Sequence, residues 1–224
     1  MIGKCLGALT IAGALALPAG LADGAAVISL STHYPHFDDD QAGATAGPFL
    51  DPDTGVWGTI TTTQILDSSG NPGGTLDFRD SQSGINDTSI SGAERWTFKW
   101  NVDTQFLRID FSSVAPAALV GIQSDAWIDA DITPGVSAVS FDKTTGTFTM
   151  DGTLTGDTLS PDRWWGNSVI PVIPAGTEIS IFSPNGDSFS IGDGFTFALL
   201  VPEPASTAML AMGLAPLALR RRVG

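Results

Sequence analysis

The chain has 224 residues, enough for one domain or at most two small ones. With 24 acidic and 10 basic residues the net charge is −14, which excludes non-specific nucleic-acid binding because such binding needs cations to neutralise phosphates. Only 15% of the residues are charged, and 26 glycines and 14 prolines disfavour long helices, so the composition indicates strands and turns.

Residues 1–26 have the pattern of a secretory signal helix. Lys4 supplies a positive charge, an apolar run follows, and small residues come next. Cleavage after Ala22 or after Ala26 fits this pattern, and either cut removes Cys5, the only cysteine. We therefore expect an exported protein whose mature part has no disulfide and no thiol chemistry.

Residues 27–200 form the expected folded domain, with 22 acidic and six basic residues and a net charge of −16. The segments Ala26–Ser31 and Val56–Leu66 are rich in β-branched and apolar residues, so we expect them to be strands. Loops are expected in three polar segments, namely His33–Asp53, Asp67–Gly74 and Asp80–Gly92.

Apolar and polar residues alternate from Trp96 to Val102 and again from Leu107 to Phe111. This period of two predicts two strands, each with one buried face, on which Trp96 and Trp100 belong to the core. Because only a short break separates the two runs, we expect them to pair as an antiparallel hairpin.

A second hairpin is predicted from Val139 to Met150, with Gly146 in its turn. The final strands are expected between Ile179 and Leu199, with Pro184–Asp187 as a turn. Many short strands separated by turns predict an all-β fold, a two-sheet antiparallel β-sandwich of jelly-roll-like kind. Helices are expected only at the two ends, as an N-terminal signal helix and a short C-terminal hydrophobic helix.

Residues 201–224 combine three features in a fixed order. Pro202, Glu203 and Pro204 form a short motif, an apolar run from Ala205 to Leu219 follows, and Arg220, Arg221 and Arg222 end that run. As a helix the apolar run spans about 22 Å, which is short of the roughly 30 Å hydrocarbon core of a bilayer. The positive-inside rule places the arginine tail in the cytoplasm and the folded domain outside.

This order resembles the PEP-CTERM sorting signal, which is read by an exosortase, a membrane cysteine transpeptidase of bacteria that export exopolysaccharide. The resemblance implies that Pro202, Glu203 and Pro204 are the recognition element and that the exosortase is a transient partner. It also implies contact with the membrane only through the C-terminal helix, before processing. Pro216 departs from the pattern because it kinks the span.

Three segments of the folded domain are similar to the ectodomain found upstream of PEP-CTERM signals: Gly92–Phe98, Phe106–Phe111 and Gly176–Phe197. This second resemblance supports the sandwich and implies no particular activity.

Calcium takes oxygen ligands, and loops that contain aspartate and glycine supply them. Asp51 and Asp53 precede a glycine, although the segment departs from an EF-hand loop. Asp129 and Asp131 lie two residues apart in an expected strand, so both carboxylates face the same way. These four aspartates are candidate calcium ligands, with turn formation as the alternative, and we expect no other cofactor.

Signatures of catalysis are missing from the sequence. His33 and His36 are the only histidines, and the intervening proline favours a solvated acidic loop over a zinc site or a catalytic triad. No serine lies in a Gly-x-Ser-x-Gly elbow. Glu94 and Glu178 share no glycosidase motif. We therefore expect that the protein is not an enzyme.

Trp164 and Trp165 lie in an expected loop, where at least one ring is expected to be exposed. Exposed aromatic rings stack on sugar rings, so the pair is a candidate ligand-binding site. The alternative is that the loop folds a ring over the edge of the sandwich.

We expect a secreted, non-enzymatic protein of the cell surface or extracellular matrix, sorted and processed by an exosortase, with a structural or adhesive role. The first alternative is a carbohydrate-binding module for exopolysaccharide that uses the tryptophan pair, and a more distant one is a hydrolase.

Overall fold

The computed structural model describes eight segments of the chain: residues 25–30, 41–50, 57–79, 82–87, 89–114, 117–151, 165–166 and 168–200. The predicted signal helix, except for its last residues, and the whole predicted sorting signal lie outside these segments.

The described segments form strands joined by turns and one short 3₁₀ helix. The strands are β1 (Ala25–Leu30), β2 (Thr45–Leu50), β3 (Trp57–Leu66), β4 (Leu76–Arg79), β5 (Gln82–Ile85), β6 (Arg95–Trp100), β7 (Thr104–Val114), β8 (Leu119–Ser124), β9 (Val139–Asp142), β10 (Thr147–Asp151), β11 (Glu178–Phe182) and β12 (Phe189–Leu200). The 3₁₀ helix η1 (Asp125–Trp127) begins where the Ser124 hydroxyl accepts a hydrogen bond from the Ala126 N–H.

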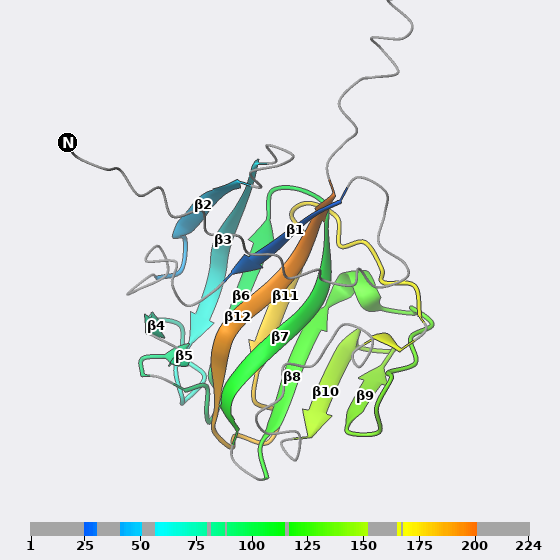
Figure 1. Ribbon diagram of the computed structural model, residues 1–224. Helices are drawn as coiled ribbons and strands as arrows, with labels where there is room; N and C mark the ends of the chain where they lie inside the picture. Colours follow the sequence, from blue (N-terminus) through cyan, green and yellow to red (C-terminus); the bar gives the residue numbers. More distant parts are fainter. Residues whose placement is uncertain are drawn as a thin grey trace, which may run out of the picture.

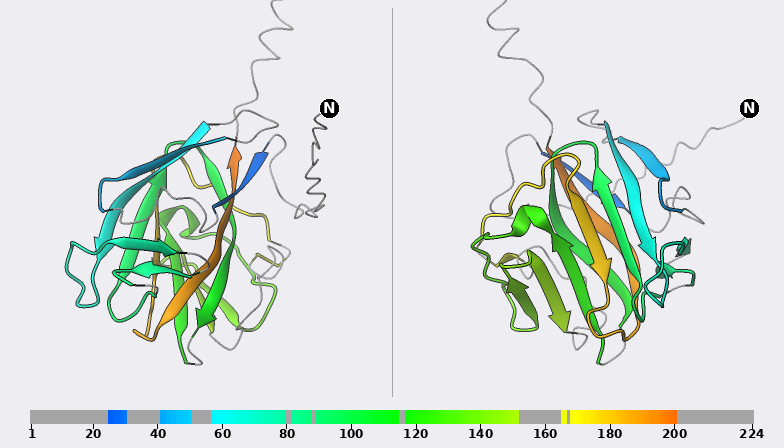
Figure 2. Two further views of the ribbon diagram at one scale, coloured as in Figure 1. Left: turned by 60° about the vertical axis from the view of Figure 1, so that its left-hand side comes forward. Right: turned by 180° about the vertical axis from the view of Figure 1, so that it is seen from behind.

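The strands form two antiparallel sheets. A five-stranded sheet has the order β1-β12-β5-β4, and β7 pairs with β12 as well. A seven-stranded sheet has the order β2-β3-β6-β11-β8-β10-β9. Figures 1 and 2 show the two sheets as layers, with β1, β12 and β7 in front of β6, β11, β8 and β10 in the first view.

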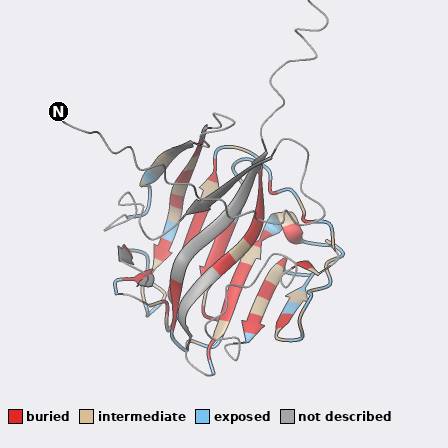
Figure 3. Cartoon of the chain, viewed as in Figure 1, coloured by how far each residue is buried: buried red, intermediate tan, exposed pale blue. Residues whose placement is uncertain are grey.

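The core lies between these layers. Its largest buried side chains are aromatic and come from β6, β7, β10, β12, η1 and the turn at residue 165: Trp96, Phe98, Trp100, Phe106, Trp127, Phe148, Trp165 and Phe189. Buried positions recur on the strands of the seven-stranded sheet in Figure 3. The prediction of a mostly β, antiparallel fold is confirmed.

Several predicted elements are found where the sequence pattern places them. The strands β1 and β3 match the two expected N-terminal strands. The strands β9 and β10 form the predicted hairpin, in which Phe141 pairs with Phe148. The turn after β11 is also present, and Gly186 within it has a positive φ of 78°.

The predicted hairpin of Trp96–Val102 with Leu107–Phe111 is wrong. The first run, β6, pairs with β3 and β11, whereas the second, β7, pairs with β12 in the other sheet. The linker between β6 and β7 is hydrogen-bonded to other segments of the chain. Asn101 Oδ1 accepts a hydrogen bond from the Thr59 N–H, and Asp103 Oδ1 accepts one from the Ala175 N–H. Alternation reveals which face of a strand is buried, but it does not reveal which sheet contains that strand.

Four strands replace segments that were expected to be loops or had no assignment, and one of them is β8, which the sequence pattern did not locate. Thr45–Leu50 forms β2 within the polar stretch, and Gln82–Ile85 forms β5 beside Leu76–Arg79, which forms β4. The strands β2, β4 and β5 lie at or near a sheet edge, where few buried apolar side chains are needed and the alternation is weak, whereas β8 lies inside the seven-stranded sheet between β11 and β10. In the part of the chain that the structure describes, no helix has the length and apolar character that crossing a membrane requires.

Candidate functional site

The outer face of the seven-stranded sheet carries a stacked arginine. The guanidinium carbon of Arg95, on β6, lies 4.2 Å from the centre of the Phe182 ring on β11. A Cβ atom added at Gly121, on β8, would lie 2.7 Å from Cζ of the same ring. Glycine at this position therefore leaves room for the ring against the sheet and for the guanidinium against the ring.

Two hydrogen bonds help to position the Arg95 guanidinium. Arg95 Nη1 donates to Gln123 Oε1 at 3.4 Å, and Gln123 Nε2 donates to the Thr145 carbonyl at 3.1 Å. We call Arg95, Gly121, Gln123 and Phe182 the Arg95 cluster. Its members come from three adjacent strands, so the sheet itself sets their spacing.

Rows of polar side chains cross the same face. Because Trp96, Phe98 and Trp100 are buried in the core, the alternate positions of β6 point to the opposite side. Strand register aligns Thr97 with polar residues of four further strands: Ser180, Gln123, Thr147 and Asp142. The neighbouring row, through Arg95, continues into Phe182, Gly121, Thr149 and Ser140.

The electrostatics of the Arg95 cluster are unusual for such an acidic protein. Among the described residues no carboxylate pairs with Arg95, whose contacts are the Phe182 ring and Gln123. Burial lowers the pKa of the Arg95 guanidinium, since desolvation disfavours its charged form. Lys99, two positions beyond Thr97 on the same face, lies directly opposite Glu178 of β11 in the strand register. The two cations lie about 13 Å apart along the strand.

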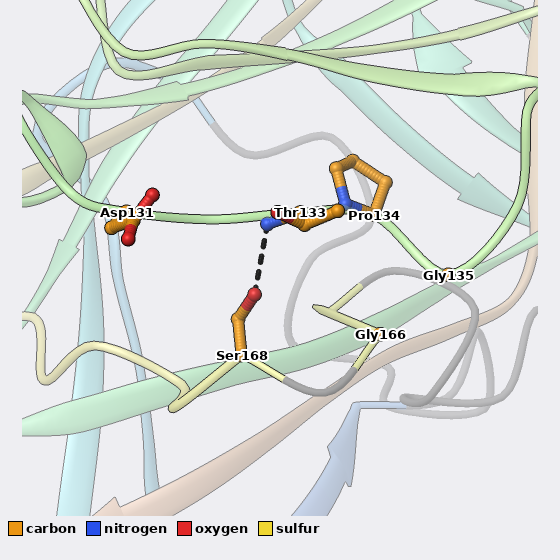
Figure 4. A pocket seen from close by; sticks show the side chains of 6 residues that line it. All are labelled: Asp131, Thr133, Pro134, Gly135, Gly166 and Ser168. Atoms are coloured by element: carbon orange, nitrogen blue, oxygen red, sulfur yellow. Dashed lines mark hydrogen bonds between the residues drawn. The ribbon is translucent and has the colours of Figure 1, made fainter.

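A shallow pocket of about 490 Å³ lies elsewhere, between the loop after η1 and the turn at residue 166. Figure 4 shows its wall, formed by Asp131, Thr133, Pro134, Gly135, Gly166 and Ser168. The Thr133 N–H donates to Ser168 Oγ at 2.8 Å and closes one side of the pocket.

Asp129 and Asp131 do not lie in a strand, so that prediction is wrong. Both are exposed in the loop after η1, and Asp129 has a φ of 61° while its N–H donates to the Lys143 carbonyl. Their carboxylates are therefore not aligned by a pleat. No group of three His, Cys, Asp or Glu side chains suited to a metal ion occurs in the described segments. A calcium site at Asp129 and Asp131 stays a prediction.

Trp165 is buried, with 1% of its surface exposed, so its assignment as a ligand-binding residue is wrong. Its Nε1–H donates to the Leu107 carbonyl at 3.2 Å, and its ring packs edge-on against Phe148 and Trp127 at centroid distances of 4.9 and 5.7 Å. The alternative, in which the loop folds a ring inward, agrees with the burial of Trp165 in the core. Trp164 lies outside the described residues.

Other residues singled out from the sequence are placed as follows. Trp96 and Trp100 are core residues, as predicted, and Trp127 joins them. Glu94 directly precedes the first residue of β6, whereas Glu178 pairs with Lys99 near the last residue of β6. The two glutamates are therefore not brought together. The candidate residues outside the described segments are His33, His36, Asp51, Asp53, Pro202, Glu203, Pro204, Arg220, Arg221 and Arg222.

The Arg95 cluster was not predicted. Alternation places Arg95 on the side of Thr97 and Lys99, which is a usable signal, but only the strand register reveals that Phe182, Gly121 and Gln123 lie beside it. No protein-family model, curated protein or solved structure matches the chain.

Proposed function

We propose that this is a secreted, non-enzymatic component of the cell surface or extracellular matrix, sorted by an exosortase through residues 201–224. The observation that carries the proposal is the position of the sorting motif relative to the fold. Strand β12 ends at Leu200, and Pro202, Glu203 and Pro204 follow at once. Removal of the tail after this motif leaves β12 whole.

The other end of the domain supports the same proposal. Ala25 pairs with Leu200 and Ala26 with Leu199, so the start of β1 and the end of β12 lie side by side at one end of the five-stranded sheet, as Figure 1 shows. Cleavage after Ala26 would remove two paired residues of β1, whereas cleavage after Ala22 leaves the strand intact. We therefore assign the signal cleavage to Ala22.

We further infer that the two sheets form a sandwich of jelly-roll-like kind. This inference is supported by the chain path, which passes between the sheets at consecutive strands: β6 lies in the seven-stranded sheet, β7 in the other, and β8 in the first again. The same change of sheet occurs between β11 and β12. Crossings of this kind are the basis of Greek-key and jelly-roll architectures.

Intact-mass measurement of the protein recovered from its producing cells tests the sorting proposal. We expect a chain that begins at Asp23 and ends after the Pro-Glu-Pro motif. Glu203→Ala should retain the tail through Gly224, and Glu178→Ala, at an exposed glutamate of β11, is the matched control that should be processed normally. Recovery of Arg220–Arg222 on most of the surface protein would refute the proposal.

A further inference from the structure

We propose that a junction of three connections at one end of the sandwich is most stable when Glu94 carries a proton and opens more readily when Glu94 is ionised. The connections run from β3 to β4, from β5 to β6 and from β11 to β12, and each passes from one sheet to the other. The proposal does not depend on the sorting signal, since all its evidence lies within the folded domain.

The three connections meet at Gly92 and Ala93, which we call the loop junction together with their partners Ser68 and Gly186. The Gly92 N–H donates to the Gly186 carbonyl at 2.8 Å, and the Ala93 N–H donates to the Ser68 carbonyl at 3.0 Å. A Cβ atom added at Gly92, whose φ is 57°, would lie 2.7 Å from the Ser68 oxygen. Glycine at this position therefore permits the close approach of two connections.

Glu94 directly follows the loop junction and is hydrogen-bonded to its own connection. The Glu94 N–H donates to the Ser91 carbonyl at 3.0 Å, and Glu94 Oε2 accepts the Ser91 N–H at 2.6 Å. These two bonds enclose Gly92 and Ala93 in a tight turn. Only 4% of the Glu94 surface is exposed. Moving the carboxylate into water breaks the second bond and frees the turn that holds Gly92 and Ala93 in place.

Acidic side chains come to this end of the sandwich from all three connections. Asp67 belongs to the connection from β3 to β4 and Asp87 to the connection from β5 to β6, and both repel a negative charge on Glu94. Asp187 belongs to the turn from β11 to β12, where its carboxylate accepts a hydrogen bond from Asn185 Nδ2.

No cation offsets these acids at Glu94. In the described segments no lysine or arginine forms an ion pair with Glu94, and the Arg95 guanidinium stacks on an aromatic ring on the outer face of the sheet. Burial raises the pKa of Glu94, and the hydrogen bond from the Ser91 N–H opposes that shift. Repulsion from Asp87 and Asp67 adds to it. The closed junction therefore holds the proton more tightly than the open junction, in which the carboxylate is hydrated.

The loop junction is consequently most stable in acid. A proton that is bound more tightly in the closed state stabilises that state fully below the ordinary pKa of glutamate, and the stabilisation is lost as pH rises through the raised value. Opening breaks the hydrogen bonds of Gly92 and Ala93 but leaves the strands paired, because these bonds join connections and are not part of a sheet ladder.

Native-state amide hydrogen exchange of the protein recovered from its producing cells, followed by NMR between about pH 4 and pH 7, tests the proposal. Protection factors correct for the intrinsic pH dependence of exchange. We expect those of the junction amides, Gly92 and Ala93, to fall at least about twofold over this range. The Thr177 amide, which donates to the Pro174 carbonyl in the exposed turn before β11, is the internal reference and should keep its protection.

Three variants separate Glu94 from a general effect of charge. Glu94→Gln keeps an oxygen that can accept from Ser91 but cannot ionise, so protection of the junction amides should no longer change with pH. Glu178→Gln, at an exposed glutamate of β11, is the matched control and should show the same fall as the parent. Asp87→Asn keeps an oxygen for the Ser89 N–H and removes one repelling charge, so it should reduce the fall.

Constant protection of the junction amides in the parent would overturn the proposal, and so would a fall that persists in Glu94→Gln. An equal fall at the Thr177 amide would show a general effect of pH and refute a specific role of Glu94. Protection equal to that of the Phe98 amide in the core strand β6 would mean that the junction opens only when the whole domain unfolds, which also contradicts the proposal. If Glu94→Gln does not fold, an unchanged fall in Asp87→Asn is decisive against it.

Discussion

Because Trp165 is buried, we expect it to contribute to the stability of the fold. Trp165→Ala removes a ring that packs against Phe148 and Trp127, and it should destabilise the fold by about 3–5 kcal/mol. Trp165→Phe keeps an aromatic ring but leaves the Leu107 carbonyl without its donor, so a loss of about 1–2 kcal/mol is expected. Urea denaturation measures both losses.

The control for Trp165 is Val169→Ala, at a side chain that is 75% exposed, where a change within about 0.5 kcal/mol is expected. If Trp165→Ala were as mild as this control, the ring would not be part of the core, and the ligand-binding assignment would need to be reconsidered.

Glu94 makes stability depend on pH. Its side chain is 4% exposed and accepts the Ser91 N–H at 2.6 Å. Burial raises the pKa of Glu94 above 4.5; the hydrogen bond from Ser91 opposes the shift, and repulsion from Asp87 and Asp67 adds to it. Because the folded state holds this proton more tightly, its stabilising contribution is full below the ordinary pKa and is lost as pH rises through the raised value.

Glu94→Gln removes this titration while keeping an oxygen that can accept from Ser91. The variant should therefore gain stability relative to the parent between about pH 4 and pH 7, as followed by urea denaturation at each pH. Glu178→Gln, at an exposed carboxyl, corrects for the change in net charge. A difference between Glu94→Gln and the parent that falls over this range would contradict the assignment.

At the scale of elements, the β9–β10 hairpin depends on Gly146. Its φ is 62°, and an added Cβ would overlap the Ser124 carbonyl oxygen, which is backbone and cannot rotate away. Gly176 has a similar φ of 83° but no atom within 4 Å of an added Cβ. Gly176→Ala should cost about 1–2 kcal/mol, the penalty of the left-handed conformation, and Gly146→Ala clearly more.

Melting curves of the two glycine variants measure this difference. Equal losses would mean that the hairpin can move away from Ser124, and that only the backbone conformation matters at Gly146.

The sequence predicts where the strands lie better than it predicts which strands pair with each other. Alternation locates β6, β7, β9, β10 and β11 because each has a buried apolar face. It does not reveal that β6 and β7 belong to different sheets, since the face of a strand that packs on the core is apolar in either sheet. The Arg95 cluster depends on that missing information, because Gly121 and Phe182 follow Arg95 by 26 and 87 positions.

The sequence could not decide the roles of the loop residues for another reason. Aspartates in a polar segment are equally compatible with a turn and with an ion site, and Asp129 takes the left-handed conformation that suits a turn. A tryptophan in a loop is likewise compatible with exposure or burial. For Trp165 the neighbours Phe148 and Leu107, which are distant in sequence, decide between the two.

At the scale of the whole molecule, the start of β1 and the end of β12 lie at one end of the five-stranded sheet, where Ala25 pairs with Leu200. A protein held through its C-terminal tail would then keep one fixed end towards the membrane. The turn between β11 and β12, where Asn185 donates to the Ala117 carbonyl, lies at the opposite end of β12. The polar face of the other sheet extends along the side between these two ends.

The pairing of β12 with a strand on each side also has a mechanical consequence. This strand pairs with β7 from Phe189 to Leu199 and with β1 from Phe195 to Leu200. Ladder hydrogen bonds run perpendicular to the strands, so tension applied at Leu200 along β12 loads many of them at once instead of opening them one after another. A tether attached at this point pulls on the sheet in shear, the direction in which paired strands resist separation most strongly.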